Sequence, residues 1–126
     1  MTENLFEIYI DIYLNNLVVF FGENRKNLHK KMAERLTKDD LDYFKGLNFQ
    51  RGKAVGFNDA GVTILWLNKV PDSVDCLAVL NHEIFHCVCM ILERVGVKYS
   101  EDSDEAYAYL IGHLTRKIYE KLNLKF

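Results

Sequence analysis

The sequence predicts an α+β fold, and three patterns in its 126 residues carry that prediction. Residues 5–14 alternate between apolar and polar side chains, which is typical of a strand with one buried face. Residues 62–67 are rich in β-branched and aromatic side chains, which favour a strand. Residues 74–95 contain no glycine or proline and are apolar on most sides, which is typical of a buried helix. We therefore expect a small twisted, mostly antiparallel sheet packed against this long helix and a C-terminal helix.

The N-terminal part of the chain is expected to hold two strands. Residues 17–21 form the second, with Asn15 and Asn16 as the turn before it, and one curved element over residues 5–21 is the alternative. A helix should then begin at Glu23 or Asn24 and run to about residue 36.

The middle of the chain carries cap and turn signals. Thr37 with Asp40 three residues later predicts a cap for a further helical turn through residue 44. Glycines at 46, 52 and 56 indicate loops and a short strand, and residues 58–61 (Asn-Asp-Ala-Gly) indicate a turn.

Caps also bound the two helices of the C-terminal half. Asp72 and Ser73 are expected to start the long helix, and Gly96 to end it. Ser100 is expected to cap the last helix, which should run to about residue 122. Its core stripe is predicted to consist of Tyr107, Leu110, Ile111, Leu114, Ile118 and Leu122.

Composition limits the classes of function. The chain has 49% hydrophobic and 27% charged residues, an ordinary globular balance that fits one domain over residues 1–126. A net charge of −2 argues against nucleic acid as a partner, and the basic stretch 25–38 is expected to be a solvated helix face. No signal-peptide pattern and no uninterrupted apolar span appear, which predicts a cytoplasmic protein without a membrane partner. Its three cysteines suggest no disulfide framework.

Residues 82–86 read His-Glu-Ile-Phe-His, an HExxH motif within the long apolar helix. Side chains four residues apart lie on one face of a helix, so His82 and His86 can reach one metal ion. Glu83 then lies beside a water held by that ion. Burial of these three polar side chains is costly without partners, and a metal supplies them. The alternative is that the histidines are core residues satisfied by hydrogen bonds.

Glu105 is the preferred candidate for a third ligand, because a catalytic zinc ion usually has three protein ligands and one open position. It lies one turn into the last helix, and Ala108 and Gly112 share its face. We expect these small residues to allow the two helices to approach closely. Glu101 and Asp102 are more easily understood as charges at a helix start. Cys89 is a poor candidate, because it lies two helical turns, about 10.5 Å, beyond His82.

HExxH followed after eighteen residues by Glu105-Ala106-Tyr107-Ala108 resembles the gluzincin pattern of HExxH followed by ExxA. The short chain is similar to ImmA/IrrE-type peptidase domains of mobile elements and to small phage-encoded HExxH proteins. The resemblance covers less than half of the chain. It implies a zincin-like fold, Zn²⁺ held by His82, His86 and Glu105, and Glu83 as the base. It also implies a protein of a bacterial cytoplasm, or of a virion if phage-encoded.

The chain departs from that pattern at Tyr109, where many gluzincins have an aspartate that orients a ligand histidine. Tyr109 is the candidate that would accept the imidazole N–H or donate to an oxyanion. Tyr107 and His113 are the other nearby donors, although packing or surface roles suit all three residues better.

The expected function is zinc-dependent hydrolysis of a peptide or protein substrate, with metal-activated water and Glu83 as general base. The strand at 62–67, if it lies at a sheet edge, is expected to bind the substrate as an added strand. The alternative is a structural or interaction protein of a phage or mobile element that keeps a metal-bound core without turnover. Two weaker hypotheses are a peptidase that cleaves a regulator and a hydrolase of non-peptide substrates. The sequence gives no prediction of the oligomeric state.

Overall fold

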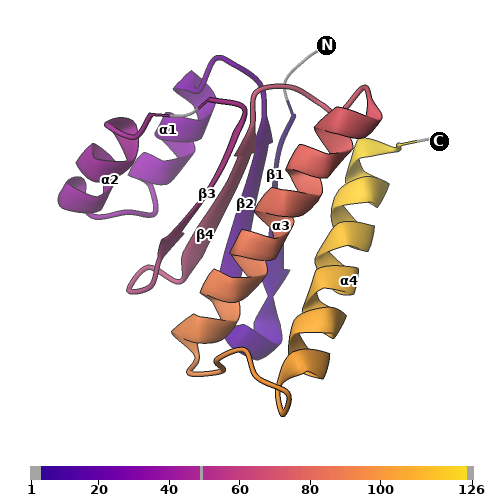
Figure 1. Ribbon diagram of the computed structural model, residues 1–126. Coiled ribbons are helices and arrows are strands. Elements are labelled where there is room, and N and C mark those ends of the chain that lie inside the picture. The colour runs from indigo at the N-terminus through magenta and orange to yellow at the C-terminus, as the bar shows by residue number, and fades with distance from the viewer. Residues whose placement is uncertain (1–3, 49, 125–126) are drawn as a thin grey trace.

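The computed structural model describes residues 4–48 and 50–124 and confirms an α+β architecture (Figure 1). Its elements are, in chain order, β1 (Asn4–Ile10), the short 3₁₀ helix η1 (Asp11–Tyr13), β2 (Asn15–Phe21), α1 (Lys26–Ala33), α2 (Lys38–Lys45), β3 (Gly52–Phe57), β4 (Val62–Leu67), α3 (Val74–Arg94) and α4 (Asp104–Leu122).

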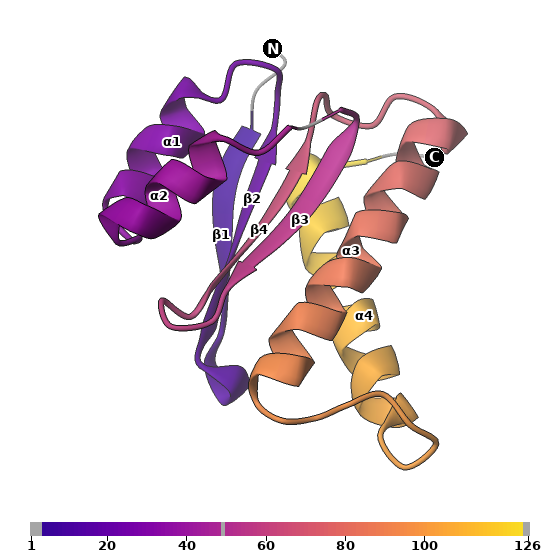
Figure 2. The same ribbon diagram turned by 60° about the vertical axis from the view of Figure 1, so that its left-hand side comes forward.

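The four strands form one mixed sheet in the order β1-β2-β4-β3. β1 and β2 pair antiparallel, β2 and β4 pair parallel, and β3 and β4 pair antiparallel. β4 therefore lies inside the sheet, so the condition for strand addition at residues 62–67, a place at the sheet edge, is not met. The edge strands are β1 and β3, and β3 is the one that lies along α3 (Figure 2).

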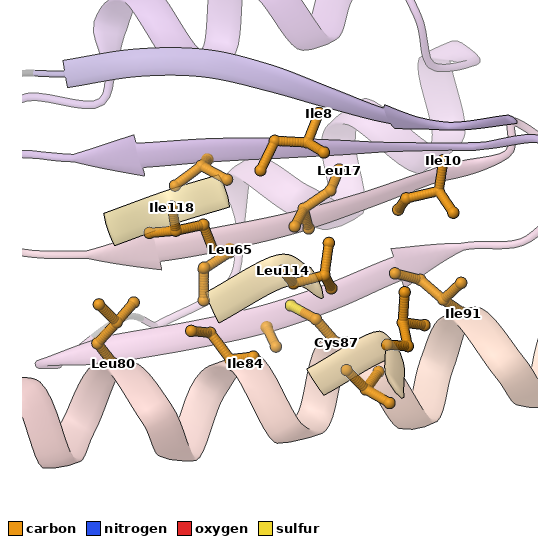
Figure 3. Packing of buried hydrophobic residues seen from close by; sticks show 14 of the residues in the cluster. Ile8, Ile10, Leu17, Leu65, Leu80, Ile84, Cys87, Ile91, Leu114 and Ile118 are labelled. Atoms are coloured by element: carbon orange, nitrogen blue, oxygen red, sulfur yellow. The ribbon is translucent and has the colours of Figure 1, made fainter. Parts of the chain in front are cut away.

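Helices cover both faces of the sheet, with α1 and α2 on one side and α3 and α4 on the other (Figures 1 and 2). Side chains of β2 alternate between the two cores. Val18 and Phe20 pack with α1 and α2, whereas Leu17, Val19 and Phe21 pack with α3 and α4. Burial on both faces explains why β2 and β4 are almost continuously apolar. Figure 3 shows the larger core, where side chains of α3 and α4 meet those of the sheet.

The first strand ends earlier than its alternating pattern predicts. The chain leaves β1 after Ile10, passes through η1, and turns at Leu14, whose φ of 49° is left-handed. Asn15 and Asn16 begin β2 and do not form the turn, so that expectation is wrong. Asn15 is instead buried, and its Oδ1 accepts a hydrogen bond from the Thr63 hydroxyl at 3.2 Å. This pair satisfies two polar groups inside the sheet.

The caps confirm most of the helix boundaries. The Thr37 hydroxyl accepts the Asp40 N–H at 3.2 Å, and the Ser73 hydroxyl accepts the Cys76 N–H at 3.2 Å. Gly96 ends α3 with a φ of 85°, which favours glycine.

The expected cap at Ser100 is wrong, because α4 begins after Ser103. The Ser103 hydroxyl accepts the Ser100 N–H at 2.9 Å and donates to the carbonyl of Lys98. The connecting loop is therefore folded around Ser103, and the acidic residues before it belong to the loop.

α3 is also the helix, among the described residues, whose length and apolar composition would suit a membrane span. Core helices have the same properties. Leu80, Ile84, Cys87, Val88 and Ile91 pack on the sheet, which accounts for its apolar character.

Glu7 forms ion pairs with Lys31 of α1, at 2.9 Å, and with Arg35 just after α1, at 2.8 Å. Partial burial acts to raise the pKa of Glu7, but Lys31 and Arg35 outweigh it, and the pKa falls below its ordinary value. A carboxyl with a lowered folded-state pKa adds stability above its unfolded-state pKa. That stability disappears as pH falls through the folded-state pKa.

We expect Glu7→Gln to lower the free energy of unfolding at pH 7, and this deficit to shrink as the pH falls through the folded-state pKa of Glu7. Urea unfolding at several pH values measures the difference. The control is Glu34→Gln, at an exposed carboxylate just after α1. A Glu7→Gln deficit that stays constant as the pH falls would contradict the ion-pair account.

Candidate metal centre

His82 and His86 lie in the middle of α3, and the structure brings their rings together. The two Nε2 atoms are 3.1 Å apart, and the ring centroids are 4.7 Å apart with the planes at 78°. Without a metal, this contact is a hydrogen bond in which one imidazole donates to the other, according to tautomer. The expected pairing at a spacing of four residues is therefore present.

Both histidines are exposed, so the expectation that they are buried is wrong. Ile84 points into the core, and at about 100° per residue His82 and His86 lie on almost the opposite side of the helix. The sheet covers one face of α3, and α4 covers a flank. An exposed imidazole needs no metal to satisfy it, so burial cost no longer argues for a metal ion. The argument rests on the geometry of the pair.

That geometry fits two ligands of one ion. Zinc–nitrogen bonds are about 2.0–2.1 Å long, so two nitrogens on a tetrahedral zinc ion lie about 3.3–3.4 Å apart. The observed Nε2–Nε2 separation of 3.1 Å differs from this by a few tenths of an ångström. Small rotations of two exposed rings would close that difference. The two residues present therefore fit zinc as a partial ligand set.

Glu83 lies on the flank of α3 that faces the edge strand β3. It is half-buried, and it lines a hollow of about 410 Å³ together with His82 and the start of β3. A carboxylate, an imidazole and a free strand edge thus open into one space. The hollow also contains Arg51, whose guanidinium donates to Asp75 of α3 at 2.6 Å.

Gly52 allows β3 to approach Glu83 closely. A Cβ at this position would lie 3.2 Å from Glu83 Cγ, 3.2 Å from Val79 Cγ1 and 3.3 Å from the Trp66 carbonyl oxygen. These contacts are tight and include backbone, so the two elements would have to separate slightly. From the sequence, Gly52 indicated only a loop region. Its close contact with Glu83 could not be predicted, because the two residues are far apart along the chain.

We expect Gly52→Ala to lower the free energy of unfolding by about 1–3 kcal/mol, the usual cost of overpacking. Chemical denaturation measures this change. Gly56→Ala is the matched control on the same strand, since its Cβ would meet the flexible Met90 side chain at 3.4 Å or more. Equal effects of the two substitutions would contradict the close approach at Gly52.

Glu105 does not join the histidines in this structure. α3 and α4 run antiparallel, and the Tyr119 hydroxyl donates to Asn81 Oδ1 at 3.1 Å, which sets their alignment. Glu105 lies in the first turn of α4, beside the far end of α3, and is separated from His86 by on the order of 10 Å along the helix axis. Among residues 4–48 and 50–124, no three His, Cys, Asp or Glu side chains gather as a metal site.

The small-residue face of α4 does not pack against α3 as expected. Ala108 is exposed, and a Cβ at Gly112 would meet nothing within 4 Å. The helix instead buries the larger apolar residues of its stripe, of which Tyr107, Leu110, Leu114 and Ile118 are buried. The burial of large apolar surface thus orients α4 and directs Glu105 to solvent.

Tyr109 and His113 also lie away from the histidine pair. Both line a groove between β1 and α4, whereas His82 and Glu83 line the hollow beside β3. Tyr107 is buried, and its hydroxyl donates to the Val97 carbonyl at 2.7 Å, which is a packing role. None of the three expected donors is therefore placed to act on a substrate held at His82.

Two cysteines of α3, Cys87 and Cys89, lie where the thiolate form is disfavoured. Cys87 is fully buried, and burial raises the pKa of its thiol, as does the nearby Glu83 carboxylate. Burial also raises the pKa of the half-buried Cys89, beside Glu93. A metal-binding cysteine acts as a thiolate, which these environments disfavour.

Comparison of the chain with family models, curated proteins and solved structures finds no match. The site is therefore interpreted from its own geometry.

Proposed function

We propose that this chain is a zinc-dependent hydrolase that cleaves peptide bonds. One observation carries the proposal, namely the Nε2 atoms of His82 and His86 at 3.1 Å on the outer face of α3. Glu83 supports it, because this carboxylate opens into a hollow that it shares with His82. Two imidazoles also suit zinc among the common divalent ions.

Bound zinc would supply a Lewis acid for the scissile carbonyl and lower the pKa of a water. Glu83 acts as general base, since its half-buried carboxylate takes a proton in the hollow and passes it to the leaving amine. β3 holds an extended substrate, because it is the edge strand beside α3 and pairs only with β4 among the described residues. Water, substrate or a third protein ligand would fill the remaining coordination positions of the metal.

Incubation of the zinc-loaded chain with a mixed peptide library tests this function, with mass spectrometry as the readout. We expect defined cleavage products that disappear with a chelator and return when zinc is added. The doubly substituted His82→Ala/His86→Ala chain, purified in parallel, controls for contaminating proteases. A zinc-bound chain that cleaves nothing above this control would contradict the proposal.

A non-catalytic interaction protein, such as a component of a phage or mobile element, is the second candidate. The observation that favours it is the lack of a third ligand near His82 and His86 in the described part of the chain. A structural zinc site is expected to be closed by four protein ligands, and this exposed pair is open, which argues against a purely structural ion. Zinc binding without cleavage by the wild type would favour this candidate.

A further inference from the structure

A second hollow on the described surface lies away from the one beside His82, between residues 7–13 and the outer face of α4. We call it the β1–α4 groove, and its volume is about 830 Å³. Its wall on one side is β1, which pairs with β2 alone among the described residues. The free N–H and C=O groups of an edge strand can pair with another chain.

β1 has none of the residues that normally protect an edge strand. Residues 4–10 contain no lysine, proline or glycine. The one charged side chain, Glu7, is neutralised within the chain by Lys31 and Arg35. The opposite edge, β3, differs because it contains Lys53 and two glycines. β1 is therefore the less protected of the two edge strands.

Large apolar side chains are exposed along the same groove. Tyr9 is 57% exposed, Ile12 is 77% exposed and Tyr109 is 76% exposed, and all three line it. Isolated exposed apolar residues are common, but several around one groove and one free strand indicate a binding surface.

We propose that this surface binds a second copy of the chain, with the two β1 strands pairing antiparallel across a two-fold axis. Such a contact is self-complementary and closed, and it would join the two sheets into one. A register centred on Ile8 places Phe6 opposite Ile10 of the second copy and keeps the two Glu7 side chains apart. Opposed residues then share a face, which antiparallel pairing requires.

The charges of the groove favour a second copy over an unrelated peptide. Asp11 lies at one end of the groove, and Lys121 lies at the other, with its Nζ 6.0 Å from the ring of Phe6. A two-fold axis between antiparallel strands brings opposite ends together. Asp11 of each chain thus comes to the end of the groove where Lys121 of the other lies, so the rotation brings opposite charges together.

Sedimentation of the full chain over a range of concentrations tests the proposal. A reductant must be present so that the cysteines do not cross-link the chains. We expect the wild type to sediment as a dimer and the Ile12→Lys and Tyr9→Glu variants to dissociate at least about tenfold more readily, since a charge replaces an apolar side chain and the new glutamate at position 9 would oppose Glu7 of the second copy. Tyr43→Glu is the matched control, because Tyr43 lies on α2 and is 61% exposed.

Amide hydrogen exchange provides the second readout, which does not depend on how the variants fold. We expect protection of β1 amides in the wild type to increase with protein concentration and that of β3 amides to stay constant. A chain that remains monomeric at all concentrations would overturn the proposal and leave the groove to an extended peptide. A dimer that Tyr43→Glu weakens as much as Tyr9→Glu would overturn it too.

Discussion

Glu83→Gln is expected to reduce peptide hydrolysis by roughly 10²- to 10⁴-fold, the usual contribution of a general base, while zinc stays bound. Glutamine keeps the size of the side chain and its position beside Gly52, but it cannot take a proton at neutral pH. Zinc binding should persist because the proposed ligands are the imidazoles of His82 and His86, whose Nε2 atoms are 3.1 Å apart, and not the Glu83 carboxylate. Initial cleavage rates and the zinc content of the same preparation measure the two effects.

Glu93→Gln is the matched control for this experiment. Glu93 is an exposed glutamate on the same helix, and it does not line the hollow that contains Glu83. Its substitution should leave the cleavage rate unchanged. If Glu83→Gln cleaves peptides as fast as the wild type, Glu83 is not the base and the proposed mechanism is wrong.

His82→Ala and His86→Ala should each weaken zinc binding by at least about 100-fold. Removal of a group that only hydrogen-bonds to a metal ligand already lowers metal affinity by roughly 10- to 100-fold. Glu105→Ala should bind zinc as the wild type does, since Glu105 lies at the distant end of the antiparallel helix pair. Isothermal titration with zinc measures the affinities. Circular dichroism of each variant shows whether the fold is retained.

His113→Ala controls for loss of an imidazole that is not part of the pair. It lines the β1–α4 groove, so its removal should leave zinc affinity unchanged. A large loss of affinity in Glu105→Ala would mean that α4 shifts on metal binding and supplies the third ligand. That result would restore the ligand set that the gluzincin resemblance implies.

Local features of the fold were predictable from the sequence because short-range chemistry determines them. Thr37 and Ser73 cap their helices through hydroxyl groups that accept nearby N–H donors. Gly96 ends α3 in a left-handed conformation. The contact between His82 and His86 follows from helical periodicity alone. Each of these features involves residues within a few positions of one another.

Features that depend on distant partners were predicted less well. Whether His82 is buried depends on which elements cover α3, and the sheet covers only the face that contains Ile84. The prediction for Glu105 relied on the small residues beside it, but the larger residues of α4, such as Leu114, determine how this helix packs. The position of β4 inside the sheet follows from its parallel pairing with β2, to which it is joined through α1, α2 and β3. No local pattern encodes that pairing.

X-ray absorption spectroscopy of the zinc-loaded chain tests most directly whether His82 and His86 bind one ion together. We predict two imidazole nitrogens at about 2.0–2.1 Å, with the remaining ligands being light atoms. The same measurement on His86→Ala should show at most one imidazole. A zinc ion with sulfur at about 2.3 Å, or without imidazole, would contradict the account by placing the metal at a cysteine or elsewhere on the chain.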